Sequence, residues 1–340
     1  MKCGLLRASV GARFHLSIKE GRPIHIKQTL AVLSLTVLAA CTPSSATEPH
    51  GEWELVWFDG FDGDALDRGK WKPEQSCWGG GNDERQCYTD RPENIELSDG
   101  ILRLKARKEE FKGPLRPPEI ADDPNPTRTQ KYTSGKVRSK GLAAWKYGRI
   151  EVRAKVPSGQ GLWPAVWMMP DEPAYGGWPL SGEIDILETV NIGTDCDQCP
   201  GSDVENRTVS AIHFGDLPPG NSYVDQKTPL AQGGLPSDDF NIYAVEWGEG
   251  LIVFFVNGAE HLRVKRGEWF TGSDLADGNP NAPFDQPFYV MANLAVGGRW
   301  PERENEKGLD PDAVPAELQI DWIRVYQCAG DRETGRACMN

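Results

Sequence analysis

The 340-residue chain has no surplus of positive charge and little helical periodicity. Its 37 Lys and Arg are outnumbered by 50 Asp and Glu, giving a net charge of −13. This balance argues against the basic surface that nucleic acid phosphates require, so no nucleic acid partner is expected. Because helical periods are weak after residue 50, long amphipathic helices are not expected either. The 37 Gly and 26 Pro instead favour many short elements joined by tight turns.

The N-terminus has the pattern of an export signal. Six basic residues precede the apolar run 30–40, which is too short to span a bilayer, and Cys41 follows it. The ending Leu38-Ala39-Ala40-Cys41 resembles a bacterial lipobox, in which the Cys becomes the lipid-carrying first residue of the mature protein. A plain secretory peptide is the alternative.

We therefore predict a lipoprotein signal peptide at residues 1–40 and a tether at residues 41–50. The protein is expected to be exported and anchored by lipid at Cys41 to a bacterial membrane, either the outer membrane or the cell surface. Because residues 1–40 carry six basic residues and one acidic residue, Glu20, their removal changes the net charge from −13 to −18.

Six cysteines remain once Cys3 and Cys41 are set aside: Cys77, Cys87, Cys196, Cys199, Cys328 and Cys338. An even number in an exported chain predicts disulfides. Pairing between sequence neighbours gives 77–87, 196–199 and 328–338, although six cysteines allow about 15 connectivities. Zinc is the weaker alternative, because Cys196-x-x-Cys199 has no second ligand pair at zinc-finger spacing.

After residue 50 the pattern is that of one all-β domain. Apolar and charged residues alternate in 102–107 and 149–156, which predicts antiparallel strands with one buried face. Asn257-Gly258 and Asp99-Gly100 predict tight turns whose two central residues have φ > 0. We interpret the Pro-rich segment 109–131 as a long surface loop. The prediction is a sandwich over 51–328, followed by a short Cys-closed tail at 329–340.

Three carboxylates lie in the otherwise apolar strand 181–190, where burial makes an unused charge costly. Glu183 and Asp185 share a face, whereas Glu188 would face the other way in a regular strand. A β-bulge adds one residue and returns Glu188 to the shared face. Two carboxyl groups about 5–5.5 Å apart are typical of a retaining glycosidase. A structural or calcium-binding carboxylate cluster is the alternative.

Tryptophans surround this strand in the sequence. Indole faces stack on pyranose rings, so such residues beside paired carboxylates indicate a sugar-binding cleft, although core packing is the alternative for each of them. We favour a substrate role for Trp163, Trp178 and Trp300 and include Trp167, which fits either role.

Two polar residues have two open interpretations each. His213 lies alone in the apolar segment 209–214, where it is either a hydrogen-bonded core residue or a cleft residue. Asn94 is either a turn residue or a sugar hydrogen-bond donor. The residue types alone do not decide between these roles.

Together these segments resemble the laminarinase-like branch of glycoside hydrolase family 16. The resemblance covers essentially all of 51–328 in family order, through 88–109, 132–170, 181–188, 239–247, 283–301 and 318–327. The E-x-D-x-x-E spacing at 183–188 matches the bulged signature that laminarinases share with agarases. The unbulged E-x-D-x-E form of bacterial lichenases is absent from this position.

The resemblance implies a β-jelly-roll sandwich of two antiparallel sheets with an open substrate cleft on the concave face. It implies a retaining endo-hydrolase of β-1,3-glucan that uses no catalytic metal. Glu183 matches the nucleophile, Asp185 the helper and Glu188 the acid/base. Positions that the family often uses in the cleft are matched by Asn94, Trp163, Trp178, His213 and Trp300.

Two further features concern the family pattern. Many members hold a structural calcium on the convex side, and Gly100 and Asp321 match its ligand positions, with Asp59 as a further candidate. Ordinary strand residues are the alternative. The Cys-bearing stretch 192–207 departs from the pattern and is expected at or near the cleft.

Rival functions remain open on this fold. Mixed-linkage β-1,3-1,4-glucan or an agarose-type galactan would use the same carboxylates, and a transglycosylase would intercept the covalent intermediate with sugar. A non-catalytic glucan-binding protein would typically lack Glu183 and Glu188, and both are present. No basic cluster near 163–188 is available for sulfate esters. We expect a monomer whose partner is β-glucan.

Overall fold

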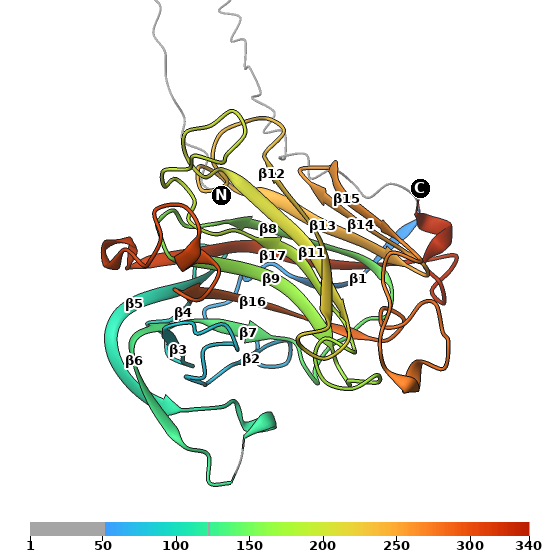
Figure 1. Cartoon of the computed structure of the whole chain (residues 1–340), viewed down its shortest axis with the longest axis horizontal. Coiled ribbons are helices and arrows are strands. Elements are labelled where there is room, and N and C mark those ends of the chain that lie inside the picture. The colour runs from blue at the N-terminus through green and yellow to red at the C-terminus, as the bar shows by residue number, and fades with distance from the viewer. Residues whose placement is uncertain (1–51, 122, 340) are drawn as a thin grey trace, which may run out of the picture. The chain divides into compact units, whose positions relative to one another are not determined.

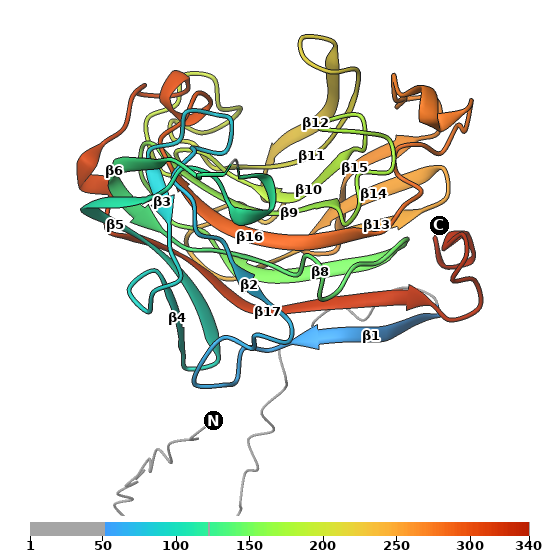
Figure 2. The same cartoon turned by 90° about the horizontal axis from the view of Figure 1, so that it is seen from below.

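The computed structural model describes residues 52–121 and 123–339. The predicted signal peptide, Cys41 and the tether lie outside the described residues. Two curved β-sheets packed face to face form a jelly-roll sandwich (Figures 1 and 2), so the all-β prediction is confirmed. No helix in the described part of the chain has the length and apolar character needed to cross a membrane.

The larger sheet has ten strands, and its pairing is antiparallel except between β3 and β6. Along its path the strands are β15 (Ala259–Lys265), β14 (Leu251–Val256), β13 (Asn241–Gly248), β8 (Gly148–Lys155), β17 (Ala316–Cys328), β5 (Ile101–Pro114), β6 (Thr127–Ser134) and β3 (Gln86–Tyr88). Beside this path, β1 (Trp53–Asp59) pairs with β17 and β4 (Ile95–Ser98) pairs with β5.

The smaller sheet has seven strands in the order β12 (Asn221–Pro229), β11 (Arg207–Gly215), β10 (Glu183–Glu188), β9 (Leu162–Pro170), β16 (Phe288–Val296), β7 (Lys136–Arg138) and β2 (Lys72–Pro73). Short 3₁₀ turns lie in the connections and in the tail that follows β17: η1 (Pro118–Ile120), η2 (Asp274–Ala276), η3 (Pro301–Arg303), η4 (Pro311–Ala313) and η5 (Arg336–Cys338). Figure 2 shows loops rising on both sides of the outer face of this sheet.

The core lies between the two sheets and is built by strand alternation. In β8 the apolar residues Ile150, Val152 and Ala154 are fully buried, as the period of two predicts. From the smaller sheet, Ile184, Ile212 and their neighbours on adjacent strands join the same apolar cluster. Burial of one face of each sheet fixes which residues of the seven-stranded sheet face outward.

Both predicted turns are confirmed. Asn257 and Gly258 join β14 to β15 with φ angles of 50° and 81°, and Asp99 and Gly100 join β4 to β5 with 56° and 72°. Positive φ at both central positions matches the right-handed twist of the flanking strands.

The loop predicted at 109–131 is wrong in part. Strand β5 continues to Pro114 and β6 begins at Thr127, so only 115–126 connects them. The outer parts of these strands pair mainly with each other and are largely exposed. With few buried positions, this part of the hairpin carries no apolar alternation that a sequence pattern could reveal.

All three predicted disulfides are present, joining Cys77 to Cys87, Cys196 to Cys199 and Cys328 to Cys338. The zinc alternative for Cys196 and Cys199 is therefore not needed. Each disulfide closes a local loop: Cys196–Cys199 lies in the connection between β10 and β11, whereas Cys87 and Cys328 lie in strands β3 and β17 of the ten-stranded sheet.

Candidate active site

Strand β10 contains the predicted β-bulge. Asp185 pairs with Trp167 of β9, and the next paired residue, Leu187, is opposite Val166, so Ile186 is the extra residue. Ile186 and Leu187 are consecutive, yet both are fully buried in the core. Two successive inward residues return Glu188 to the outward face of Glu183 and Asp185. The Ser210 hydroxyl of β11 donates to the Ile186 carbonyl at 3.1 Å and so supplies this carbonyl of the bulge with a hydrogen-bond donor.

Strand register extends this outward face across β11 and β12. Glu183 is opposite His213, which is opposite Tyr223. Glu188 is opposite Val209, which is opposite Lys227. Residues directly opposite each other share a face, so these side chains stand on the outer surface of the seven-stranded sheet.

Tryptophans hold the two glutamates from different sides. The Trp178 indole N–H donates to Glu183 Oε2 at 2.5 Å, and the Trp163 indole N–H donates to Glu188 Oε1 at 2.8 Å. Trp163 also contacts Trp300 in an edge-to-face arrangement, with 5.2 Å between the ring centroids. The structure therefore brings two of the predicted tryptophans to the two carboxylates and places a third, Trp300, against Trp163.

His213 completes the carboxylate cluster. Its Nε2 lies 3.3 Å from Asp185 Oδ2, and its ring lies between Trp178 and Tyr223 at centroid distances of 6.1 and 5.6 Å. Tyr223 is 61% exposed, so the aromatic row ends in solvent. Of the two roles open for His213, the outward position beside the carboxylates is the one that the structure shows.

Burial dominates the electrostatics of the cluster. It raises the pKa of Glu188 to about 7, against the opposing effects of the His213 charge and the Trp163 hydrogen bond. Burial and then the charges of Glu183 and Glu188 raise the pKa of Asp185. Burial alone would lower the pKa of His213, but the hydrogen bond and charge of Asp185 raise it to about 10. Glu188 is therefore a member of this cluster that changes charge near neutral pH.

Trp167 also lies on the outer face, one strand away from Asp185. Its indole N–H donates to Asn293 Oδ1 at 2.7 Å, and Lys136 Nζ lies 5.0 Å from its ring centroid. Lys136 in turn lies 3.2 Å from the buried carboxylate of Glu74. Trp167 is thus held by polar partners on a surface next to the carboxylates, rather than in the core.

The prediction of a substrate role for Asn94 is wrong. Asn94 is fully buried, and its amide N–H groups donate to the Lys105 carbonyl and to Thr133 Oγ1. Its Oδ1 accepts from Thr89 and Arg91. With every hydrogen-bonding group of the side chain used, Asn94 joins a turn to β5 and β6, which is the structural alternative.

The predicted calcium ligands lie on or beside the neighbouring strands β1, β17 and β5, and both aspartates already have partners within the protein. Asp59 accepts hydrogen bonds from the Phe61 backbone N–H and the Trp71 indole N–H, and Asp321 pairs with Arg153. Gly100 adopts the positive φ of its turn. Calcium at Asp59, Gly100 and Asp321 stays a prediction.

Sequence reasoning missed several outward residues of this face, namely Lys136, Tyr223, Asp225, Lys227 and Asn293. Strand β12 has few apolar residues, so no apolar alternation marks it as a strand. The relevant signal is positional, since a polar strand paired with β11 must present Tyr223, Asp225 and Lys227 on one face.

The comparison with known families agrees with this geometry. A family model described as the GH16 domain of beta-porphyranases A–D matches residues 53–328. The chain belongs to glycoside hydrolase family 16. The resemblance inferred from the motifs is thereby confirmed.

Similar proteins include glucan endo-1,3-beta-glucosidase A1 of Niallia circulans, 38% identical over 80% of this chain and 38% of that protein. A beta-glucanase of Rhodothermus marinus is 36% identical over 89% of this chain and 95% of that protein. The solved laminarinase structure from Rhodothermus marinus has a TM-score of 0.63 at 34% identity, covering 81% and 97% of the two chains. The chain thus spans little more than a third of the first relative and nearly all of the second.

We expect Ser210→Ala to destabilise the family 16 domain by about 1–3 kcal/mol, because it leaves the buried Ile186 carbonyl of the bulge without its donor. Urea unfolding measures the effect. Thr208→Val on the same strand is the matched control, since the buried Thr208 hydroxyl has no hydrogen-bond partner among the described residues. An equal loss of stability in both variants would contradict the assigned role of Ser210.

Proposed function

We propose that the protein is a retaining endo-hydrolase of β-1,3-glucan. The observation that carries this proposal is the bulge in β10, which sets Glu183 and Glu188 on one outward face beside Trp163, Trp178 and Trp300. Paired carboxylates supply the acid and the nucleophile for glycosidic cleavage, and the indoles supply stacking surfaces for sugar rings. Similarity to proteins named as β-1,3-glucanases supports the choice of substrate.

In the proposed mechanism Glu183 attacks the anomeric carbon and forms a covalent glycosyl intermediate. Glu188 donates its proton to the departing glycosidic oxygen and then removes a proton from the attacking water. A pKa of about 7 supports this role, because Glu188 still holds its proton at mildly acidic pH. The Trp178 N–H orients Glu183. Asp185 keeps the His213 ring protonated, so the positive charge of this ring lies close to both glutamates.

The charges around the carboxylates favour a neutral polymer. Lys136 and Arg138 face the buried carboxylate of Glu74, and Lys227 lies 3.6 Å from Glu205. Asp225 adds a further negative charge close to Glu188. A sulfate ester would meet compensated cations and nearby carboxylates, whereas a glucan presents only hydroxyl groups and apolar ring faces.

A galactan is the second candidate substrate, because the matching family model is named for beta-porphyranases. Transglycosylation is a second candidate reaction, since the exposed Tyr223 beside His213 offers a surface on which an acceptor sugar could stack. A non-catalytic glucan-binding role is disfavoured, because Glu183 and Glu188 are both present and share one face.

A polysaccharide panel tests the proposal. On laminarin, lichenan, agarose, porphyran and carrageenan, we expect the highest kcat/KM on laminarin. Because an endo-hydrolase cuts internal bonds, oligosaccharides of intermediate length should appear early in the reaction. Glu183→Ala and Glu188→Ala should each lower laminarin turnover by roughly 10³-fold or more with native circular dichroism. Near wild-type activity in either variant would contradict the catalytic assignment, and preference for another polymer would contradict the substrate.

Azide and acceptor sugars refine the same experiment. Azide added to Glu183→Ala should restore cleavage and give an α-glycosyl azide, whereas Glu188→Ala with azide should give the β-anomer. The reverse pattern would exchange the two roles. Transglycosylation is tested with laminarin oligosaccharides as substrates and added acceptor sugars. Products longer than the starting oligosaccharides would identify transglycosylation in place of hydrolysis.

The pH profile follows from the proton on Glu188. Because the general acid must be protonated, we expect kcat/KM to fall as pH rises through about 7. Trp163→Phe removes the hydrogen bond that favours the ionised form of Glu188, so its pKa rises and this alkaline limb moves to higher pH. Trp178→Phe, which acts on Glu183, is the control. An alkaline limb that stays in place in Trp163→Phe would contradict the assignment of Glu188 as acid.

We also propose that the protein is exported and held on a bacterial membrane by lipid at Cys41, on the basis of the lipobox-like sequence 38–41. In a bacterial host, the full chain should fractionate with membranes, and Cys41→Ser should release it into the soluble fraction. Membrane fractionation that is unchanged in Cys41→Ser would contradict the anchor. The Cys3→Ser variant is the control for loss of a cysteine in the same region.

A further inference from the structure

The connection between β10 and β11 forms a small closed loop beside the candidate active site. Its two arms pair through Asp195 and Val204. Across its base the Glu205 backbone N–H donates to the Thr194 carbonyl, and the Gly193 backbone N–H donates to the Glu205 carbonyl. The disulfide between Cys196 and Cys199 closes its tip. The mechanism proposed above gives this loop no role, although it starts only a few residues after Glu188.

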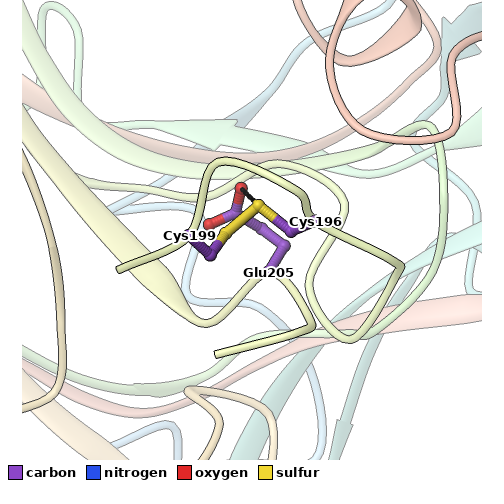
Figure 3. Close-up of side chains that lie close together, drawn as sticks. All are labelled: Cys196, Cys199 and Glu205. Carbon is purple, nitrogen blue, oxygen red and sulfur yellow. Dashed lines mark hydrogen bonds between the residues drawn. A yellow bond between two sulfur atoms is a disulfide. The ribbon is translucent and has the colours of Figure 1, made fainter. Parts of the chain in front are cut away.

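Glu205 is the centre of this loop, and its side chain is fully buried. Figure 3 shows its carboxylate directly beside the disulfide, with Cys196 Sγ 3.8 Å from Oε2. Arg207 donates to both carboxylate oxygens, at 2.7 and 2.6 Å. Burial alone would raise the pKa of Glu205, but Arg207 and Lys227 lower it below the ordinary value, so the group is a buried anion.

Two contacts connect this anion to the segment that carries Trp300. Lys227 Nζ lies 3.6 Å from Glu205 Oε2, and the same Nζ lies 5.8 Å from the Trp300 ring centroid. The Asn305 side-chain N–H donates to Glu205 Oε2 at 3.3 Å. Lys227 and Asn305 therefore join the disulfide loop to both ends of the stretch 300–305.

A different part of the chain also holds this stretch. The Arg299 backbone N–H donates to the Asn82 carbonyl at 2.8 Å, and Arg85 pairs with Glu302. Gly297 begins the turn with a φ of 65°, and a Cβ there would lie 2.5 Å from Glu302 Oε1. These contacts do not involve the loop 193–206. Loss of the contacts of Glu205 with Lys227 and Asn305 would therefore make Trp300 more mobile, while the rest of the segment stays in place.

We propose that the disulfide-closed loop 193–206 is a positioning element for Trp300, acting from Glu205 through Lys227 and Asn305. Trp300 packs on Trp163, and Trp163 donates to Glu188, so the loop sets how firmly the sugar-binding surface beside the acid/base is held. Glu205, Lys227 and the cysteines touch no reacting atom and are positioning residues. The inference rests on the proposed function, because it assumes that Trp300 contacts the polysaccharide.

A loosened Trp300 predicts a specific kinetic pattern. Its ring would lose a preferred orientation and the nearby Lys227 cation, so binding should weaken while the carboxylates in β10 keep their geometry. For Lys227→Met and for the double variant Cys196→Ser/Cys199→Ser, we expect KM to rise roughly threefold to tenfold, with kcat within about twofold of wild type. Lys227→Arg should restore most of the affinity, since it keeps the cation next to Trp300.

The matched control is Cys328→Ser/Cys338→Ser, which removes a disulfide of the ten-stranded sheet and should leave KM and kcat unchanged. The substrate is whichever polysaccharide the wild type cleaves best in the panel. Cleavage of another polymer in place of glucan would thus overturn the proposed function, while KM on that polymer still decides the role of the loop.

An unchanged KM in Lys227→Met overturns the proposal, and so does an equal rise in KM in the control double variant. A fall in kcat at constant KM would also overturn it, because this would place the effect on the chemical step. Should the Cys196→Ser/Cys199→Ser variant fail to fold, Lys227→Met and Glu205→Gln, both with the disulfide intact, decide the question through the same KM measurement.

Discussion

The candidate active site depends on one extra residue in β10. Ile186 and Leu187 both point into the core, and the burial of these two side chains holds the bulge in place. Full burial of an aliphatic side chain contributes about 1.5–3 kcal/mol, so the core fixes the direction in which Glu188 points. The cost of placing carboxylates on a half-buried sheet is met by partners on neighbouring strands: Trp163 for Glu188, and His213 for Asp185.

That arrangement places the carboxylates and two of the tryptophans predicted to stack on sugar on different kinds of segment. Glu183, Asp185, Glu188 and His213 stand on paired strands, where register fixes their relative positions. Trp178 and Trp300 stand on connections outside those strands, where changes of length and sequence are tolerated far better. The same carboxylates can therefore serve different polysaccharides in different proteins, since the strands can stay the same while the loops change.

The sequence was sufficient for those features that leave a local pattern. Alternation revealed strands such as β8, the pair Asn257-Gly258 revealed its turn, and the spacing of Glu183, Asp185 and Glu188 revealed the bulge. Asn94 failed as a prediction because an amide in a turn looks the same whether its partners are backbone groups or a sugar. Strand β12 and the distal halves of β5 and β6 escaped notice because they bury few apolar side chains. Lys227 and Glu205 could not be paired from sequence, since their contact exists only through the register of β11 and β12.

The position of the disulfides follows from the same division between strands and loops. Sheet residues are held by backbone pairing and by the core, whereas a connection such as 193–206 has few apolar contacts to limit its conformations. A covalent closure lowers the number of conformations open to such a loop before any ligand binds. Cys77–Cys87 and Cys196–Cys199 both close connections that contact the stretch 297–308, one through Asn82 and Arg85 and the other through Glu205. The two restraints thus reach the stretch that carries Trp300 from two different connections, so a segment outside the sheets is held by contacts at both of its ends.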